Sequence, residues 1–291
     1  MIHQDNERIL TLMSEYLCFT PCAITLQDVT ALSADCGIPL NEACQALLAA
    51  HCDLDTTRPD DARLYRTYFP RMLREHDAAQ YRADAYMQQV QPAFGQSGTI
   101  DLVAETVQPM ELFVADDFQV DAQGRVYPQL GWFREAFSFP AIREDGRVWM
   151  TVTPNEINTI QPAVQSSTGK VLTFGLGLGY YAFHAMLKED VTSVTVVEKN
   201  PQVIEVFTRL LLPHFPNRNK LRIIEADAFD YAANVMPGEG YDVVFTDLWH
   251  DVADGLPLYR RMKALECPGP RFLYWIEKTL RCYMDEDASS D

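Results

Sequence analysis

The feature that most restricts the fold is an uncharged run from Val171 to Leu187, between Lys170 and Lys188. Such a run has to be buried, either in protein or in lipid. It is just short of a membrane span, and three glycines and a histidine interrupt it. A buried strand, a glycine turn and a helix therefore explain it better than a membrane helix does.

Beyond this run, apolar segments of strand length alternate with segments of helical spacing. The expected strands are 171–174, 194–197, 221–224 and 241–246, and the expected helices are 179–187, 201–212, 228–235 and 256–264. Residues 271–284 could form a strand, a helix or both. This order predicts an α/β fold with a Rossmann-like, doubly wound parallel sheet, which we assign to residues 161–291.

The first ninety or so residues have helical spacing instead. Apolar stripes predict helices around 9–17, 29–36, 40–48, 61–72 and 75–90, with a break or kink at Pro70. Thr25 to Asp28 resembles a capping box, and Gly37 is a natural helix end. We expect an N-terminal all-helical domain over residues 1–98.

The segment between these parts is typical of β-structure. Residues 91–99 are rich in turn formers and are a candidate linker. Hairpins are expected around the turns 121–124 and 144–146, and we assign a β-hairpin segment to residues 99–160. Its aromatic residues are interpreted as core or, alternatively, as a lid over a ligand; they are Trp132, Phe133, Phe137 and Phe139.

Charge excludes some classes of partner. Lys plus Arg number 24 and Asp plus Glu number 41, so the formal net charge is −17. Phosphate backbones and anionic lipid repel such a chain, so we expect neither nucleic-acid nor membrane binding. Residues 25–52 have the outline of a helix-turn-helix but contain no Lys or Arg. Packing or dimerisation is the better interpretation, which leaves a homodimer open.

The cysteines give no sign of a disulfide framework or a metal site. There are seven of them without a CxxC pair, which fits a reducing cytosol. Cys36, Cys44 and Cys52 fall on apolar helical faces, where we expect them to be buried. No signal peptide is visible at the N-terminus, so the expected location is the cytoplasm.

The glycine loop is the first candidate for chemistry. Gly175, Gly177 and Gly179 follow the first strand and open a helix, where glycines permit a tight turn and close approach of a ligand. The pattern is GxGxG, and Tyr180 stands where the dinucleotide fingerprint GxGxxG has its third glycine. His184, on the helix that follows, is expected to be satisfied within the fold rather than catalytic.

Acidic residues follow three later strands, and ligands of open α/β sheets lie at these strand ends. Glu198 could bind ribose hydroxyls or be a surface acid. Asp227 could bind adenine, cap the next helix, or do both. Asp247 faces the expected reactive end of the ligand, although it could instead cap a helix or pair with an Arg.

These features resemble, in order and spacing, motifs of the class I S-adenosylmethionine-dependent methyltransferases, and more narrowly their spermidine-synthase-like branch. The resemblance lies in residues 171–179, Glu198, residues 226–228 and residues 241–247, and more loosely in 146–156. It covers about residues 148–264. It implies S-adenosylmethionine, or its decarboxylated form, as the cofactor, and Asp247 as the catalytic residue. The cofactor site it implies, without a metal, is Gly175, Leu176, Gly177, Gly179, Tyr180, Glu198, Lys199, Asp227, Ala228, Asp247 and Leu248.

Departures from the branch decide the order of the functional hypotheses. Leu178, Asn200 and Thr159 stand where aminopropyltransferases carry an acid, an acid and a tyrosine, and residues 247–251 lack the expected proline. A methyltransferase with a small-molecule acceptor therefore leads. The alternatives are an aminopropyltransferase and an inactive nucleoside-binding or scaffolding protein. Few residues follow the fourth strand, so we expect the sheet to be truncated at its C-terminal side.

Overall fold

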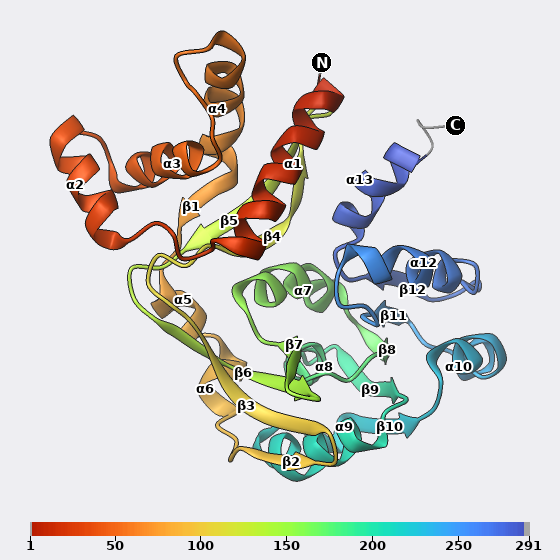
Figure 1. The fold of residues 1–291 in the computed structure, drawn as a ribbon. Helices are drawn as coiled ribbons and strands as arrows, with labels where there is room; N and C mark the ends of the chain where they lie inside the picture. The colour runs from red at the N-terminus through yellow and green to blue at the C-terminus, as the bar shows by residue number, and fades with distance from the viewer. Residues whose placement is uncertain (1, 288–291) are drawn as a thin grey trace. The chain divides into compact units, whose positions relative to one another are not determined.

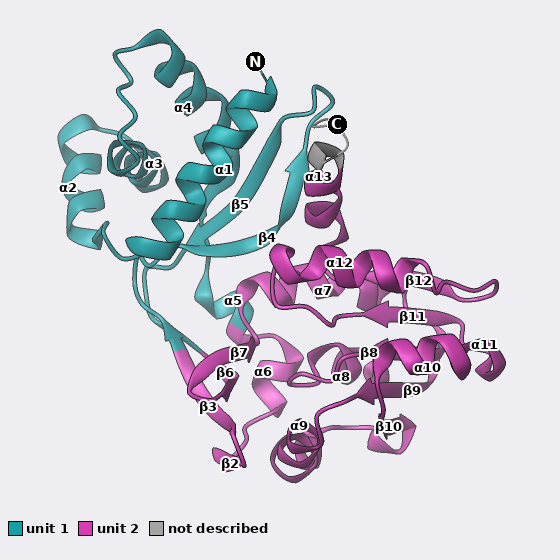
Figure 2. Cartoon of the chain, turned by 45° about the vertical axis from the view of Figure 1, so that its right-hand side comes forward, with its two compact units in different colours: residues 1–81, 106–138 teal, residues 82–105, 139–291 magenta. Residues whose placement is uncertain are grey.

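The computed structural model of the chain describes residues 2–287 (Figure 1). Two compact units divide it (Figure 2). Unit 1 combines the residues up to Tyr81 with Thr106–Ser138, and unit 2 combines Arg82–Glu105 with the residues from Phe139 onward. The predicted domains are continuous stretches of sequence, whereas each unit joins two separate segments.

The first four helices of unit 1 cover the expected stretches, although the first begins seven residues earlier than its apolar stripe. They are α1 (Ile2–Phe19), α2 (Leu26–Cys36), α3 (Leu40–His51) and α4 (Pro59–Met72). The capping box is confirmed, because Asp28 N donates to Thr25 Oγ1 at 3.2 Å and Thr25 N donates to Asp28 Oδ2 at 3.1 Å. Gly37 ends α2 in the left-handed region. Pro70 lies inside α4.

The expected helix over 75–90 is wrong. The chain forms β1 (Leu73–Glu75) and two short helices, α5 (Ala78–Arg82) and α6 (Ala85–Gln89). β1 pairs in parallel with β5 (Val126–Trp132), which in turn pairs with antiparallel β4 (Phe113–Val120). The pairing of β1 takes up only the start of the expected range, and Asp84, which caps α6, separates the two short helices. The first 98 residues are therefore not all helical.

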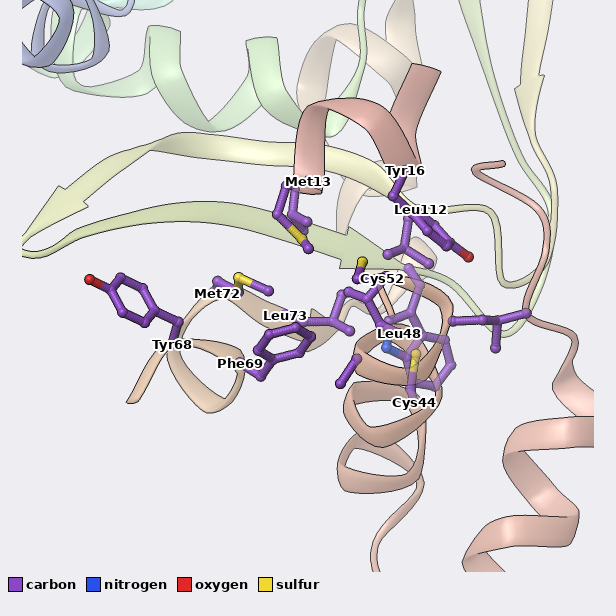
Figure 3. Close-up of a cluster of buried hydrophobic side chains, with 14 of the residues drawn as sticks. Met13, Tyr16, Cys44, Leu48, Cys52, Tyr68, Phe69, Met72, Leu73 and Leu112 are labelled. Carbon is purple, nitrogen blue, oxygen red and sulfur yellow. The ribbon is translucent and has the colours of Figure 1, made fainter. Parts of the chain in front are cut away.

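The core of unit 1 lies between its helices and its sheet (Figure 3). Met13, Leu48 and Phe69 are fully buried or nearly so, and Cys44 and Cys52 are buried as expected. Cys36 is exposed, so that prediction is wrong. It ends α2, a helix that buries only Val29.

Both expected hairpins are present, around residues 121–124 and 144–146, but they belong to different sheets. β3 (Ile100–Val107), β6 (Phe137–Glu144) and β7 (Arg147–Thr151) form a sheet with β2 (Gly95–Ser97), in the order β2-β3-β6-β7. β2 lies within the candidate linker, which is therefore partly a strand. The four aromatic residues from Trp132 to Phe139 are all buried, which favours core over lid.

The parallel sheet of unit 2 is confirmed, and with it the α/β class. All neighbouring strands are parallel, in the order β10-β9-β8-β11-β12, consistent with a Rossmann-like fold. The elements are α7 (Pro154–Ser166), β8 (Gly169–Phe174), α8 (Tyr180–Leu187), β9 (Val191–Glu198), α9 (Pro201–Val206), β10 (Leu221–Glu225), α10 (Ala228–Asn234), α11 (Met236–Glu239), β11 (Val243–Thr246), α12 (Val252–Lys263), β12 (Arg271–Tyr274) and α13 (Glu277–Asp287). The chain reverses its direction of winding between β8 and β11, and ligands of such sheets bind at that point.

The uncharged run that restricts the fold forms β8, the glycine turn and α8. Residues 271–284 supply both a strand and a helix. The expected helix over 201–212 ends at Val206 and continues as a π-helical turn, Phe207–Leu211. No helix within residues 2–287 is both long and apolar enough to cross a bilayer.

Candidate functional site

A cavity of about 210 Å³ opens at the carboxyl edge of the parallel sheet, within unit 2. All eleven residues of the predicted cofactor site line it. They come from the loops that follow β8, β9, β10 and β11, which are far apart in sequence. β7 and the first turn of α7 supply another part of the wall.

The glycine loop adopts a backbone that side chains disfavour. Gly175, Gly177 and Gly179 have φ angles of 96°, 50° and 75°. A Cβ atom at Gly175 would overlap the backbone oxygen of Asp247. Gly175 N donates to the carbonyl oxygen of Val197 at 3.0 Å. The loop is therefore fixed against two neighbouring strand ends, and the first glycine is required for that close approach.

Glu198 is held by the loops beside it. It is 8% exposed, so it is not a surface acid. Leu176 N donates to its Oε2 at 3.1 Å, and Asn200 N donates to its Oε1 at 2.8 Å. Each carboxylate oxygen can accept a further bond, so Glu198 can still bind a ligand that enters the cavity.

Asp227 caps α10, as one of its two interpretations predicts. Phe229 N and Asp230 N donate to its Oδ1 at 2.9 and 3.0 Å. Both bonds use the same oxygen, and Asp227 also lines the cavity. Its capping role and a ligand-binding role are therefore compatible.

Asp247 faces the cavity directly after β11. Asp251, not Asp247, caps α12. Burial raises the pKa of Asp247 to about 7. Its carboxyl group is therefore only partly ionised at neutral pH.

Glu156 is a second carboxyl group of the same cavity, and sequence reasoning missed it. It lies in the first turn of α7, and Thr151 Oγ1 donates to its Oε1 at 3.0 Å. Burial, and then the charge of Asp247, raise its pKa to about 8. The available signal was weak, because Glu156 ends the loosely similar segment 146–156. Nothing local in the sequence indicates that it meets Asp247.

Aromatic side chains complete the wall. The rings of Trp149, on β7, and His250 stack with centroids 5.3 Å apart and planes 5° apart. His250 Nδ1 also lies 3.2 Å from the Trp149 carbonyl oxygen. Trp249 is 6% exposed, and its buried indole N–H has no acceptor within the described residues. The hairpin segment thus contributes β7 to the cavity, and the predicted aromatic cluster does not line it.

A buried network supports the glycine loop from a segment outside the α/β alternation. Tyr180 OH donates to Asp84 Oδ2 at 3.0 Å, and His184 Nε2 lies 3.2 Å from Asp84 Oδ1. Tyr86 OH donates to the Leu178 carbonyl oxygen at 2.8 Å. His184 is satisfied within the fold, as expected. The residues next to α6 therefore hold the second half of the loop.

Comparison with known proteins adds no assignment. No protein-family model matches the chain, and no curated protein shows significant similarity to it. Within residues 2–287, no three His, Cys, Asp or Glu side chains gather in a way that could hold a metal ion.

Proposed function

We propose that this chain binds S-adenosylmethionine in the cavity of unit 2 and transfers its methyl group to a small-molecule acceptor. One observation carries the proposal: the glycine loop, Glu198, Asp227 and Asp247 come from four strand ends and line one cavity. Each is a group that a ribose, an adenine or a sulfonium would contact. Their order along the sheet edge matches the family resemblance.

Each residue has a role in this proposal. The glycine loop lets the ligand approach the backbone, and Glu198 accepts hydrogen bonds from the ribose hydroxyls. Asp227 and the N–H of Ala228 bind the adenine edge. The sulfonium lies toward Asp247 and Glu156, where negative charge favours it.

The reaction is a displacement at the methyl carbon. The lone pair of the acceptor forms the new bond while the carbon–sulfur bond breaks, and the sulfur leaves as a neutral thioether. An acceptor amine gives its proton to Asp247. A base whose pKa is about 7 suits this step at neutral pH, and positioning supplies much of the rate.

A second candidate, aminopropyl transfer, is favoured by the carboxyl pair. Glu156 and Asp247 would repel the carboxylate of S-adenosylmethionine if it lay beside them. Decarboxylated S-adenosylmethionine lacks that group but keeps the ammonium, so it would present only positive charge to the pair. The third alternative is a nucleoside-binding protein that uses the same cavity without catalysis.

Calorimetry with S-adenosylhomocysteine, S-adenosylmethionine, its decarboxylated form, NAD and ATP tests the proposal. We expect S-adenosylhomocysteine to bind and to raise the melting temperature, because it binds only the folded chain. Mass spectrometry of a panel of amines and acids then detects the transferred group. Binding of NAD without binding of S-adenosylhomocysteine would overturn the assignment.

A further inference from the structure

Glu156 and Asp247 form a pair that the proposed reaction does not fully use. Asp247 follows β11, and Glu156 lies in the first turn of α7, so two separate elements place carboxyl groups in the wall of one cavity. Glu156 has a hydrogen bond from Thr151 but no cation beside it in the described part of the chain. Two ionised carboxylates so placed repel each other and are poorly solvated.

The other charged and titratable groups around the pair do not compensate. Glu198 and Asp227 add negative charge, and the hydroxyls of Tyr86 and Tyr180 lie near Glu156. Lys199 and His250 are the basic side chains that line the cavity. Neither of them is among the charges that shift the pKa of Glu156 or Asp247, so the carboxyl pair remains short of positive charge.

Trp249 lies in the wall of the same cavity. Its buried indole N–H has no acceptor within the described residues.

We infer that Glu156 and Asp247 share one proton in the unliganded protein and exchange it for a sulfonium or ammonium cation when that cation enters the cavity. The raised pKa values of both groups support this exchange. In the unliganded cavity, the bound proton neutralises one carboxylate, so the two negative charges do not repel each other. When the cation binds, its positive charge replaces that of the proton. The inference rests on the proposed function only for the identity of the natural cation.

Thermodynamic linkage between proton release and cation binding determines how the affinity for the cation changes with pH. A cation that displaces a proton binds more tightly as pH rises, by up to about tenfold per pH unit, until the free pair has lost its proton. S-adenosylmethionine and S-adenosylhomocysteine form a matched pair of ligands, because only the first carries the sulfonium charge. We expect about one proton to be released with S-adenosylmethionine and almost none with S-adenosylhomocysteine.

Two measurements test this on the full chain. Infrared titration follows the protonated carboxyl band of the free protein, with and without trimethylsulfonium, a cation that lacks the nucleoside. The band should persist near neutral pH, its midpoint should fall with trimethylsulfonium, and the double variant Glu156→Gln/Asp247→Asn should lack it. Glu189→Gln, which removes an exposed acid outside the cavity, is the control and should keep the band.

Calorimetry in buffers of different ionisation enthalpy counts the protons released by the two nucleosides. If S-adenosylhomocysteine does not bind, the proposed function fails, while the infrared titration of the wild-type chain still decides the state of the pair. If both nucleosides bind and release equal numbers of protons, the function stands and the inference is overturned. A wild-type chain without a protonated carboxyl above about pH 6, or a midpoint that trimethylsulfonium leaves unchanged, also overturns it.

Discussion

The acids that line the cavity differ in what surrounds them, and this sets what each can do. Two backbone N–H groups fix Glu198, and the first turn of α10 fixes Asp227. Carboxylates held in this way serve as hydrogen-bond acceptors. Asp247 and Glu156 are poorly solvated and bind protons near neutral pH, which suits a base and its partner.

Replacing Glu198 tests the nucleoside end of the site. Glu198→Ala removes two expected charge-assisted hydrogen bonds to ribose, worth roughly 1.5–3 kcal/mol each, so affinity for S-adenosylhomocysteine should fall by about two orders of magnitude or more. Isothermal titration measures it. Leu176 N and Asn200 N also lose their acceptor, so some stability should be lost as well. Glu225→Gln, at an exposed strand end, is the control, and an unchanged dissociation constant in Glu198→Ala would make the acid purely structural.

Replacing Asp247 tests the reactive end. Asp247→Asn removes the proposed base but keeps the size of the side chain, so turnover should fall by about 10²-fold or more. Binding of S-adenosylhomocysteine should change only a few-fold. Steady-state rates and calorimetry on the same preparation separate the two effects. A folded variant that turns over at the wild-type rate would reject the catalytic role.

The residues of the site were predictable to different degrees. Gly175, Glu198 and Asp247 could be selected because each directly follows a strand whose apolar residues are contiguous. Glu156 could not, since it belongs to a helix that precedes the sheet, and its partner lies about ninety positions later. Local sequence patterns indicate where strands end. They do not indicate which side chains meet across a cavity.

At the scale of elements, the conformation of the glycine loop depends on the positive φ angles that glycine permits. It depends also on a close contact between two backbone segments. Gly175→Ala would force a Cβ atom against the Asp247 carbonyl at a φ of 96°. Gly240→Ala places a Cβ atom at a φ of 65° in open space. It should therefore cost only about 1–2 kcal/mol, the usual penalty for a left-handed residue.

We expect Gly175→Ala to be destabilised well beyond Gly240→Ala and to lose nucleoside binding. Denaturant unfolding of the two variants measures the difference. Equal unfolding free energies would mean that the loop can move away from β11 at little cost, which would contradict the described contact.

The alternation of strands and helices after residue 169 was predictable because each element buries its own contiguous or periodic apolar residues. The short elements between residues 73 and 97 were not. β1 exists because β5 pairs with it, and the turn around Asp84 is bound to Tyr180 and His184, about a hundred residues away. The spacing of apolar residues in a short stretch of sequence cannot indicate partners that lie so far away in the chain.

At the scale of the whole molecule, the carboxyl pair affects how stability depends on pH. Its raised pKa values mean that the folded chain binds more protons than the unfolded chain between about pH 4 and about pH 8. The pair therefore makes the free energy of unfolding fall as pH rises through this window. The net charge of −17 acts in the same direction, because self-repulsion grows as carboxyl groups ionise.

Glu156→Gln removes one member of the pair, so its free energy of unfolding should fall less steeply than that of the wild type from pH 5 to pH 8. Urea unfolding at both values measures this. Glu189→Gln, which removes an exposed acid, should follow the wild type. Parallel curves for Glu156→Gln and the wild type would show that Glu156 has an ordinary pKa in the folded chain.

The interleaved segments of the two units have a consequence for synthesis on the ribosome. Unit 1 has all of its residues once Ser138 has emerged, whereas unit 2 needs β12, well over a hundred residues later. Until then its early segment, Arg82–Glu105, lacks most of its partners. Tyr86, fully buried in the finished fold, waits for Leu178 to be made. The growing chain therefore exposes the Tyr86 side chain during this interval, and this is when we expect a chaperone to protect the chain most.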